Sequence, residues 1–164
     1  MATFLVGMYD GTIDGKNRLS VPFAFRRKLE GADHPFYVLP GPRRGTLALY
    51  PEVQFERSRP AAPEARLSEE TRAWRTFEHS QCALLNSDEQ GRVLFPERLL
   101  KRVGLGKEVT LVGVQDHIEL WNRADFQKFE DEQWARYDEN RAKAMAELRE
   151  FAPVPSAVES LPKP

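Results

Sequence analysis

The chain lacks the side chains on which several classes of protein depend. It has a single cysteine, Cys82, among 164 residues, which excludes an internal disulfide and a metal cluster built from cysteines. Its three histidines, His34, His79 and His117, do not have the spacing of metal ligands, and the glycine-rich motif of a phosphate-binding loop is missing. We therefore expect no enzyme, no metal, no cofactor and no small-molecule substrate.

Long hydrophobic runs and an excess of either charge are also missing. No apolar stretch approaches the roughly 20 residues of a membrane span, so we expect a cytoplasmic protein with no membrane partner. Lys plus Arg (24) nearly balance Asp plus Glu (25), which argues against a general attraction to polyanions. The charge is uneven, however, because residues 1–59 carry nine basic against six acidic residues. A negatively charged partner would therefore prefer the N-terminal part.

One pattern of residues occurs twice in the chain. It runs through residues 14–22 (DGKNRLSVP) and residues 88–96 (DEQGRVLFP), which share Asp, Arg and Pro at matching positions. A matching order of turn, strand, helix, strand, strand and helix follows in both copies, so one structural unit is used twice. A unit of about 50 residues is marginally stable alone, and we therefore expect the two copies to share a core with each other or with another subunit.

The two copies predict the same turn. Residues 4–13 and 17–21 have the character of strands around a turn at residues 14–17, where Asp, Gly and Asn are favourable. Asn17 occupies the position that Gly91 holds in the second copy. Asn and Gly enter the left-handed region of backbone conformation most easily, so we expect a positive φ at both.

Pro22 and Pro96 follow these strands and are expected to open short helices, because proline fits the first turn of a helix. The helices should run to about Glu30 and Val103, with a glycine ending each. Two further strands are expected in each copy, over 36–40 and 46–50 and over 108–113 and 117–121. Asn122 is expected to cap the last helix, whose aromatic residues have the spacing of a core or subunit contact.

These elements predict five segments. They are a first repeat (4–57), a linker and connecting helix (58–79), a second repeat (80–135), a C-terminal helix extension (136–150) and a disordered tail (151–164).

The repeated Asp-x-x-x-Arg motif has two interpretations that are compatible with each other. An Asp and an Arg four residues apart across a turn can pair and so close the turn. An Arg at the exit of such a turn can also project outward, where its planar guanidinium can read the O6 and N7 atoms of guanine. Lys16, two residues before Arg18, would then reach a backbone phosphate.

These motifs, together with residues 109–113 and 118–121, resemble the MraZ family of bacterial regulators, which are encoded at the head of the division and cell-wall gene cluster. The likeness covers about residues 1–135. The first motif of the family usually has Gly before its Arg, where this chain has Asn17, which keeps the turn. The resemblance implies an α+β, mainly β fold of tandem AbrB-like (swapped-hairpin, double-psi-type) barrel repeats with flanking helices. It also implies a homo-oligomeric ring that binds repeated promoter DNA elements in the nucleoid and regulates transcription.

The resemblance implies that Arg18 and Arg92 contact DNA, while Lys16 is expected on phosphate from its place in the turn. Arg26 and Arg27 are weaker candidates, because they lie on a predicted helix of which one face must be solvated, so a plain surface role is their first interpretation. The residues expected to build the turns are Asp14, Asn17, Pro22, Asp88, Gly91 and Pro96.

Charge predicts that the two copies contribute unequally. The first turn carries two basic residues against one acidic residue and is followed by three basic residues at 26–28. The second turn carries one basic residue against two acidic residues. We therefore expect the first copy to supply most of the DNA affinity, with Arg92 contributing less or serving the assembly.

Two other functions fit the same fold. One is an AbrB-fold antitoxin, although such antitoxins normally carry one hairpin module and a long toxin-binding tail, whereas this chain has two modules and a short tail. The other is a ring-forming scaffold with no role in nucleic-acid binding, which a likeness of fold alone does not distinguish from a regulator.

Overall fold

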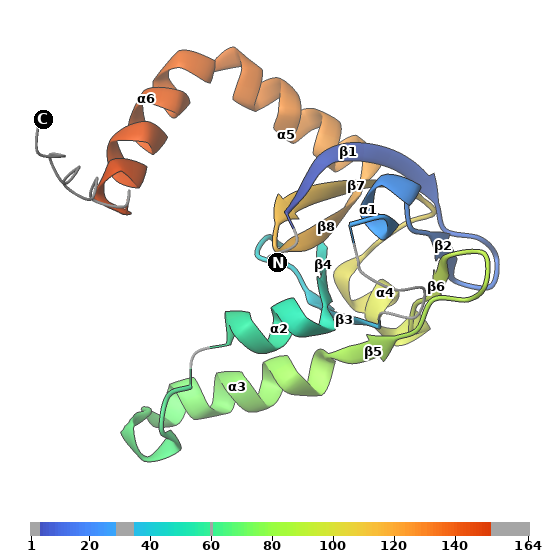
Figure 1. Cartoon of the computed structure of the whole chain (residues 1–164), viewed down its shortest axis with the longest axis horizontal. Helices are drawn as coiled ribbons and strands as arrows, with labels where there is room; N and C mark the ends of the chain where they lie inside the picture. The colour runs from blue at the N-terminus through green and yellow to red at the C-terminus, as the bar shows by residue number, and fades with distance from the viewer. Residues whose placement is uncertain (1–3, 29–34, 60, 152–164) are drawn as a thin grey trace, which may run out of the picture. The chain divides into compact units, whose positions relative to one another are not determined.

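The computed structural model describes residues 4–28, 35–59 and 61–151. The chain divides into two compact units, Met1–Phe126 and Gln127–Pro164. Both sequence copies of the motif lie in the first unit, together with the sheets and the first four α-helices (Figure 1).

A six-stranded antiparallel sheet forms the centre of the first unit. Its strand order is β1-β7-β8-β4-β3-β5. The strands are β1 (Leu5–Thr12), β3 (Phe36–Pro40), β4 (Leu47–Pro51), β5 (Ala83–Leu85), β7 (Glu108–Gln115) and β8 (His117–Asn122). A second sheet consists of two antiparallel strands, β2 (Arg18–Ser20) and β6 (Arg92–Leu94).

The two copies exchange strands reciprocally. The first strand of copy one, β1, pairs with β7 of copy two from Leu5↔Gln115 to Thr12↔Glu108. The first strand of copy two, β5, pairs with β3 of copy one, and β2 pairs with β6. Each copy therefore completes its sheets with strands from the other.

The helices of the first unit are short except for α3. They are α1 (Phe23–Arg26), α2 (Glu52–Ser58), α3 (Glu69–Gln81) and α4 (Glu97–Val103), and a 3₁₀ turn (Glu64–Arg66) precedes α3. The last helices are α5 (Arg123–Ala135) and α6 (Tyr137–Leu148), followed by a 3₁₀ turn (Arg149–Phe151). The α+β class is confirmed. Helices cover more of the described residues than strands do, however, which differs from the expected mainly β composition.

Both copies contribute to one hydrophobic core. Leu19, Val21 and Phe25 of the first copy and Val93 and Phe95 of the second are almost fully buried in the same cluster. The prediction of a shared core is confirmed, because neither copy could bury these side chains without the other.

Local signals predicted where both short helices begin and where α4 ends, but not where α1 ends. The helix α4 ends at Val103, and Gly104 follows with a φ of 74°. Pro22 and Pro96 stand immediately before α1 and α4. The helix α1 ends at Arg26, ahead of the expected Glu30, which lies outside the described residues.

Asn122 does not have the expected role as a helix cap. Its Oδ1 accepts a hydrogen bond from the Gly106 amide (2.8 Å), and its Nδ2 donates to the Gly104 carbonyl (3.0 Å). The side chain therefore fixes the segment after α4, which comes from a distant part of the sequence.

The aromatic residues of the last helices are divided between two environments. Phe126 is buried in the first unit, against Trp121 at a ring distance of 5.5 Å. Trp134 and Tyr137, in the second unit, stack on each other (5.3 Å) and are exposed. The non-helical backbone of Arg136 separates α5 from α6. Among the described helices, none combines the length and apolar character needed to span a membrane.

Candidate nucleic-acid interface

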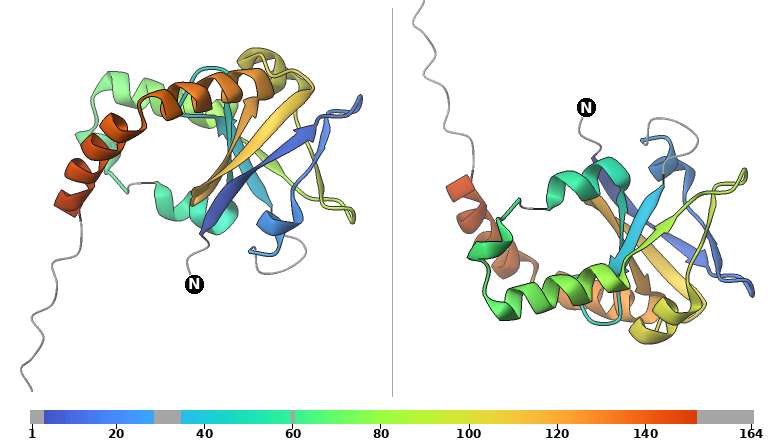
Figure 2. Two further views of the ribbon diagram at one scale, coloured as in Figure 1. Left: turned by 90° about the horizontal axis from the view of Figure 1, so that it is seen from above. Right: turned by 90° about the horizontal axis from the view of Figure 1, so that it is seen from below.

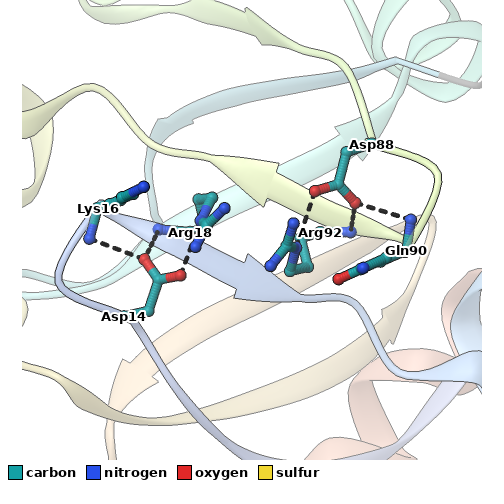
Figure 3. A network of polar contacts seen from close by, with 6 residues as sticks. All are labelled: Asp14, Lys16, Arg18, Asp88, Gln90 and Arg92. Atoms are coloured by element: carbon teal, nitrogen blue, oxygen red, sulfur yellow. Dashed lines mark hydrogen bonds and ion pairs between the residues drawn. The ribbon is translucent and has the colours of Figure 1, made fainter.

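The first Asp-x-x-x-Arg motif forms a turn that its aspartate holds together (Figure 3). Oδ1 of Asp14 accepts hydrogen bonds from the backbone amides of Lys16 and Arg18, both at 2.9 Å. Oδ2 accepts the Nε–H of Arg18 at 2.7 Å. The Asp14 amide donates to the Arg18 carbonyl (2.9 Å), and the Asn17 amide donates to the Asp14 carbonyl (3.0 Å). One carboxylate thus fixes both the backbone and the arginine.

The second motif repeats this geometry. Oδ1 of Asp88 accepts from the amides of Gln90 and Arg92 at 2.9 Å, and Oδ2 accepts from Nε of Arg92 at 2.8 Å. Asn17 and Gly91 have φ values of 61° and 73°. The expected left-handed conformation at this position is therefore confirmed in both turns.

The two turns are joined through the backbone. The Val21 amide donates to the Gly91 carbonyl (3.0 Å), and the Phe95 amide donates to the Asn17 carbonyl (2.9 Å). These bonds are equivalent under an exchange of the two copies. The turns therefore lie at opposite ends of the β2–β6 ribbon, and both project from the same end of the first unit (Figure 2).

The β2–β6 ribbon has one buried face and one outer face. Leu19 and Val93 pair at its centre and are 1% and 0% exposed. Because side chains alternate along a strand, the residues on either side of them share the opposite face. The outer face carries Arg18, Ser20, Arg92 and Leu94.

Two members of this face, Ser20 and Leu94, were not among the residues predicted from the sequence. Leu94 is 58% exposed and lies opposite Arg18 in the ladder, while Ser20 lies opposite Arg92. The alternation on either side of Leu19 and Val93 could have revealed them, once the two strands were known to pair.

The arginines keep their terminal groups available. The side chains of Arg18 and Arg92 are 31% and 28% exposed, and each contacts its aspartate through Nε. Within the described parts of the chain, their Nη1 and Nη2 groups have no hydrogen-bond partner. The aspartate thus restrains the guanidinium while leaving two amino groups to donate to another molecule. The structural and the DNA-contacting interpretations of the motif are compatible in this arrangement.

Arg26 lies against the second turn rather than the first. Its Nε donates to the Val21 carbonyl (3.0 Å), and a Cβ atom placed on Gly91 would be 2.6 Å from its Cζ. Arg27 is exposed on the same segment. The sequence counted Arg26 among the charges that follow the first turn, whereas the structure places its guanidinium beside Gly91 of the second turn, because sequence order does not reveal the exchange of strands.

The first turn faces the helix of the second copy. An open pocket of about 260 Å³ is lined by Asp14 and Asn17 on one side and by residues of α4, among them Glu97 and Lys101, on the other. Each turn therefore has the helix of the other copy beside it.

No cluster of side chains suited to a metal ion occurs among the described residues.

The turn geometry lowers the pKa of both aspartates. For Asp14 the main cause is the hydrogen bond from the Arg18 amide, and for Asp88 it is the bond from the Arg92 amide, with the guanidinium groups adding to the effect. A depressed pKa in the folded state stabilises the fold at any pH above the unfolded pKa. This contribution is lost as the pH falls through the folded pKa.

We expect an NMR titration of the side-chain carboxyl carbons to show Asp14 and Asp88 midpoints below the ordinary value for aspartate. Arg18→Ala should raise the Asp14 midpoint only in part, because the amide of residue 18 still donates to the carboxylate. Asp88 in that variant is the internal control and should not move. An Asp14 midpoint at the ordinary value in the wild type would contradict the turn geometry.

Comparison with known proteins agrees with the family resemblance that the repeated motif indicated. Residues 80–149 match the family model described as "MraZ protein, putative antitoxin-like". The chain is 33% identical over 152 residues to the transcriptional regulator MraZ of Desulfitobacterium hafniense, covering 88% of this chain and 94% of that protein. It is 30% identical over 148 residues to MraZ of Heliobacterium modesticaldum, with the same coverage of 88% and 94%. The chain belongs to the MraZ family of transcriptional regulators.

Proposed function

We propose that this protein is a sequence-specific DNA-binding regulator that acts on the promoter of the division and cell-wall gene cluster. The observation that carries the proposal is the outer face of the β2–β6 ribbon, where each arginine is fixed through Nε and keeps its amino groups available. A two-stranded β-ribbon fits the major groove of B-DNA, where an arginine can donate two hydrogen bonds to one guanine.

The residues of the two turns divide the contacts between base and backbone. Arg18 and Arg92 read guanine edges, and Lys16, Arg26 and Arg27 contact phosphates. Leu94, which is exposed beside Arg18, offers an apolar surface to bases in the groove. Base contacts specify the sequence, while phosphate contacts supply most of the affinity.

The reciprocal pairing of β1 with β7 and of β5 with β3 supports two AbrB-like swapped-hairpin repeats. We place these repeats at residues 4–57 and 80–135, joined by a linker and helix at 58–79. We place the C-terminal helix extension at 136–150 and the tail, expected from the sequence to be disordered, at 151–164, of which 152–164 lie outside the described residues. The protein would then be cytoplasmic and would associate with the nucleoid, because its two Asp-x-x-x-Arg turns bind DNA.

Assembly into a homo-oligomeric ring is part of the proposal. The edge strand β1 exposes Val6 and Met8, and the helix α3 exposes Trp74 and Phe77. Neighbouring subunits would cover these apolar side chains, and a closed ring would leave no unmatched interface.

The test is a binding assay with a duplex from upstream of the protein's own gene and a shuffled duplex of equal composition. At physiological salt we expect the specific duplex to bind roughly 10³-fold more tightly, or better, which is the range of sequence-specific proteins. Equal affinity for the two duplexes would show that the protein binds DNA without sequence specificity. No affinity for either duplex would favour the alternative of a ring-forming scaffold with no role in nucleic-acid binding.

The description of the matching family model as antitoxin-like favours one second candidate, an antitoxin that binds a toxin protein. The duplicated module argues for the regulator, because both copies of the turn keep the same arginine geometry. Co-expression with proteins encoded beside its gene, followed by co-purification, would reveal a toxin partner.

A further inference from the structure

We propose that Arg26 is the phosphate-contacting cation of the second turn, so that the first copy supplies the charge that the second copy lacks. This inference rests on the proposed DNA-binding function. It also narrows the expected difference between the two turns, because Lys16 and Arg18 serve the first turn while Arg26 and Arg92 serve the second, so we expect Arg92 to contribute about as much as Arg18.

The second turn lacks a cation of its own at its tip. Lys16 and Gln90 occupy matching positions, and the amide of each donates to the Oδ1 of its aspartate at 2.9 Å. The lysine of the first turn is therefore replaced by a neutral side chain, and Glu89 beside it adds a negative charge. Taken alone, the second turn would repel a phosphate backbone.

Arg26 reaches this turn from α1. Its Nε–H bonds to the Val21 carbonyl, and the Val21 amide bonds to the Gly91 carbonyl, both at 3.0 Å. Val21 thus connects Arg26 to the second turn through two hydrogen bonds. A Cβ on Gly91 would lie 2.6 Å from Nη1 and 2.7 Å from Cδ of Arg26, so the whole guanidinium end lies along the turn.

The difference between Asn17 and Gly91 follows from this contact. Both positions have a positive φ, which asparagine tolerates. The side chain that matches Arg26 in the second copy is Leu100, which is buried and lines the pocket beside Asn17. Asn17 thus faces a leucine in its pocket, whereas a Cβ at position 91 would displace the arginine.

The first experiment measures the salt dependence of binding to the specific duplex. The Arg26→Ala variant should bind with a log affinity that falls less steeply with log salt, by about 1 per bound subunit, because one phosphate contact is lost. Adding Gln90→Lys to this variant restores a cation at the matching position, as in the first turn, and should restore the slope. Arg57→Ala, which removes an exposed charge from α2, is the matched control and should leave the slope unchanged.

The outcomes separate this inference from the proposed function. If the wild type does not prefer the specific duplex, the proposed function fails and this inference fails with it. If the wild type binds normally while Arg26→Ala keeps the full slope, only the role of Arg26 is overturned. The inference is also overturned if Arg26→Ala reduces the salt dependence and the added Gln90→Lys does not restore it, because the reduction would then reflect a damaged fold.

A second experiment tests the placement of Arg26 without DNA. The substitution Gly91→Asn should lower the melting temperature more in the wild type than in the Arg26→Ala background, since the new side chain competes with Arg26 only when Arg26 is present. Equal changes in the two backgrounds would show that Arg26 does not lie on this turn and would overturn the inference.

Discussion

The Arg18→Ala variant is expected to lose about 1–3 kcal/mol of specific binding for each engaged subunit, or roughly 5- to 150-fold, because one bidentate contact to a base is lost. Its melting temperature should change little. The two backbone amides that donate to Asp14 remain in the variant, and an ion pair that is this exposed contributes little to stability. The measurement is a titration of specific and shuffled duplexes at one salt concentration, with melting followed in parallel.

Arg92→Ala is expected to cause a loss of similar size, since the second turn has the same geometry and Arg26 provides its positive charge. Arg57→Ala serves again as the charge-matched control. If Arg18→Ala instead melts the protein while binding per folded molecule survives, the motif has only a structural role. If Arg92→Ala binds like the wild type, only the first turn reads DNA.

The number of operator repeats in the duplex is expected to have the largest effect on affinity. A single repeat engages one subunit, whereas a second repeat binds a neighbouring subunit of the same ring at an effective concentration on the order of millimolar. Affinity should then rise by roughly 10²- to 10⁴-fold. The measurement is a titration of duplexes that carry one, two and three repeats.

The control for this prediction is the mass of the free protein in solution. Light scattering coupled to gel filtration should give several times the chain mass of 18.8 kDa. A monomer at micromolar concentration, or equal affinity for all three duplexes, would contradict the ring and the avidity that follows from it.

The features that the sequence predicted well depend on neighbouring residues. The positive φ at Asn17 and Gly91 and the end of α4 at Gly104 follow from the conformational preferences of single residues. The pairing of each Asp with its Arg needs only a four-residue turn.

The features that the sequence did not predict depend on contacts between distant segments. No local pattern shows that β1 pairs with β7 rather than with β2. The position of Arg26 on the second turn follows from that exchange. Asn122 has the residue type of a helix cap, but the loop after α4 offers its side chain both a donor and an acceptor.

The most direct measurement tests whether the two arginines read guanines. Operator guanines are replaced one at a time by 7-deazaguanine, which lacks the N7 acceptor, and each duplex is titrated with the wild type, Arg18→Ala and Arg92→Ala. We predict one guanine whose substitution affects binding only when Arg18 is present, and another whose substitution affects binding only when Arg92 is present. At each of them the loss of N7 should weaken wild-type binding by about 1 kcal/mol or more, and should not weaken the matching variant further. Additive losses at every guanine would contradict base reading by the β2–β6 ribbon.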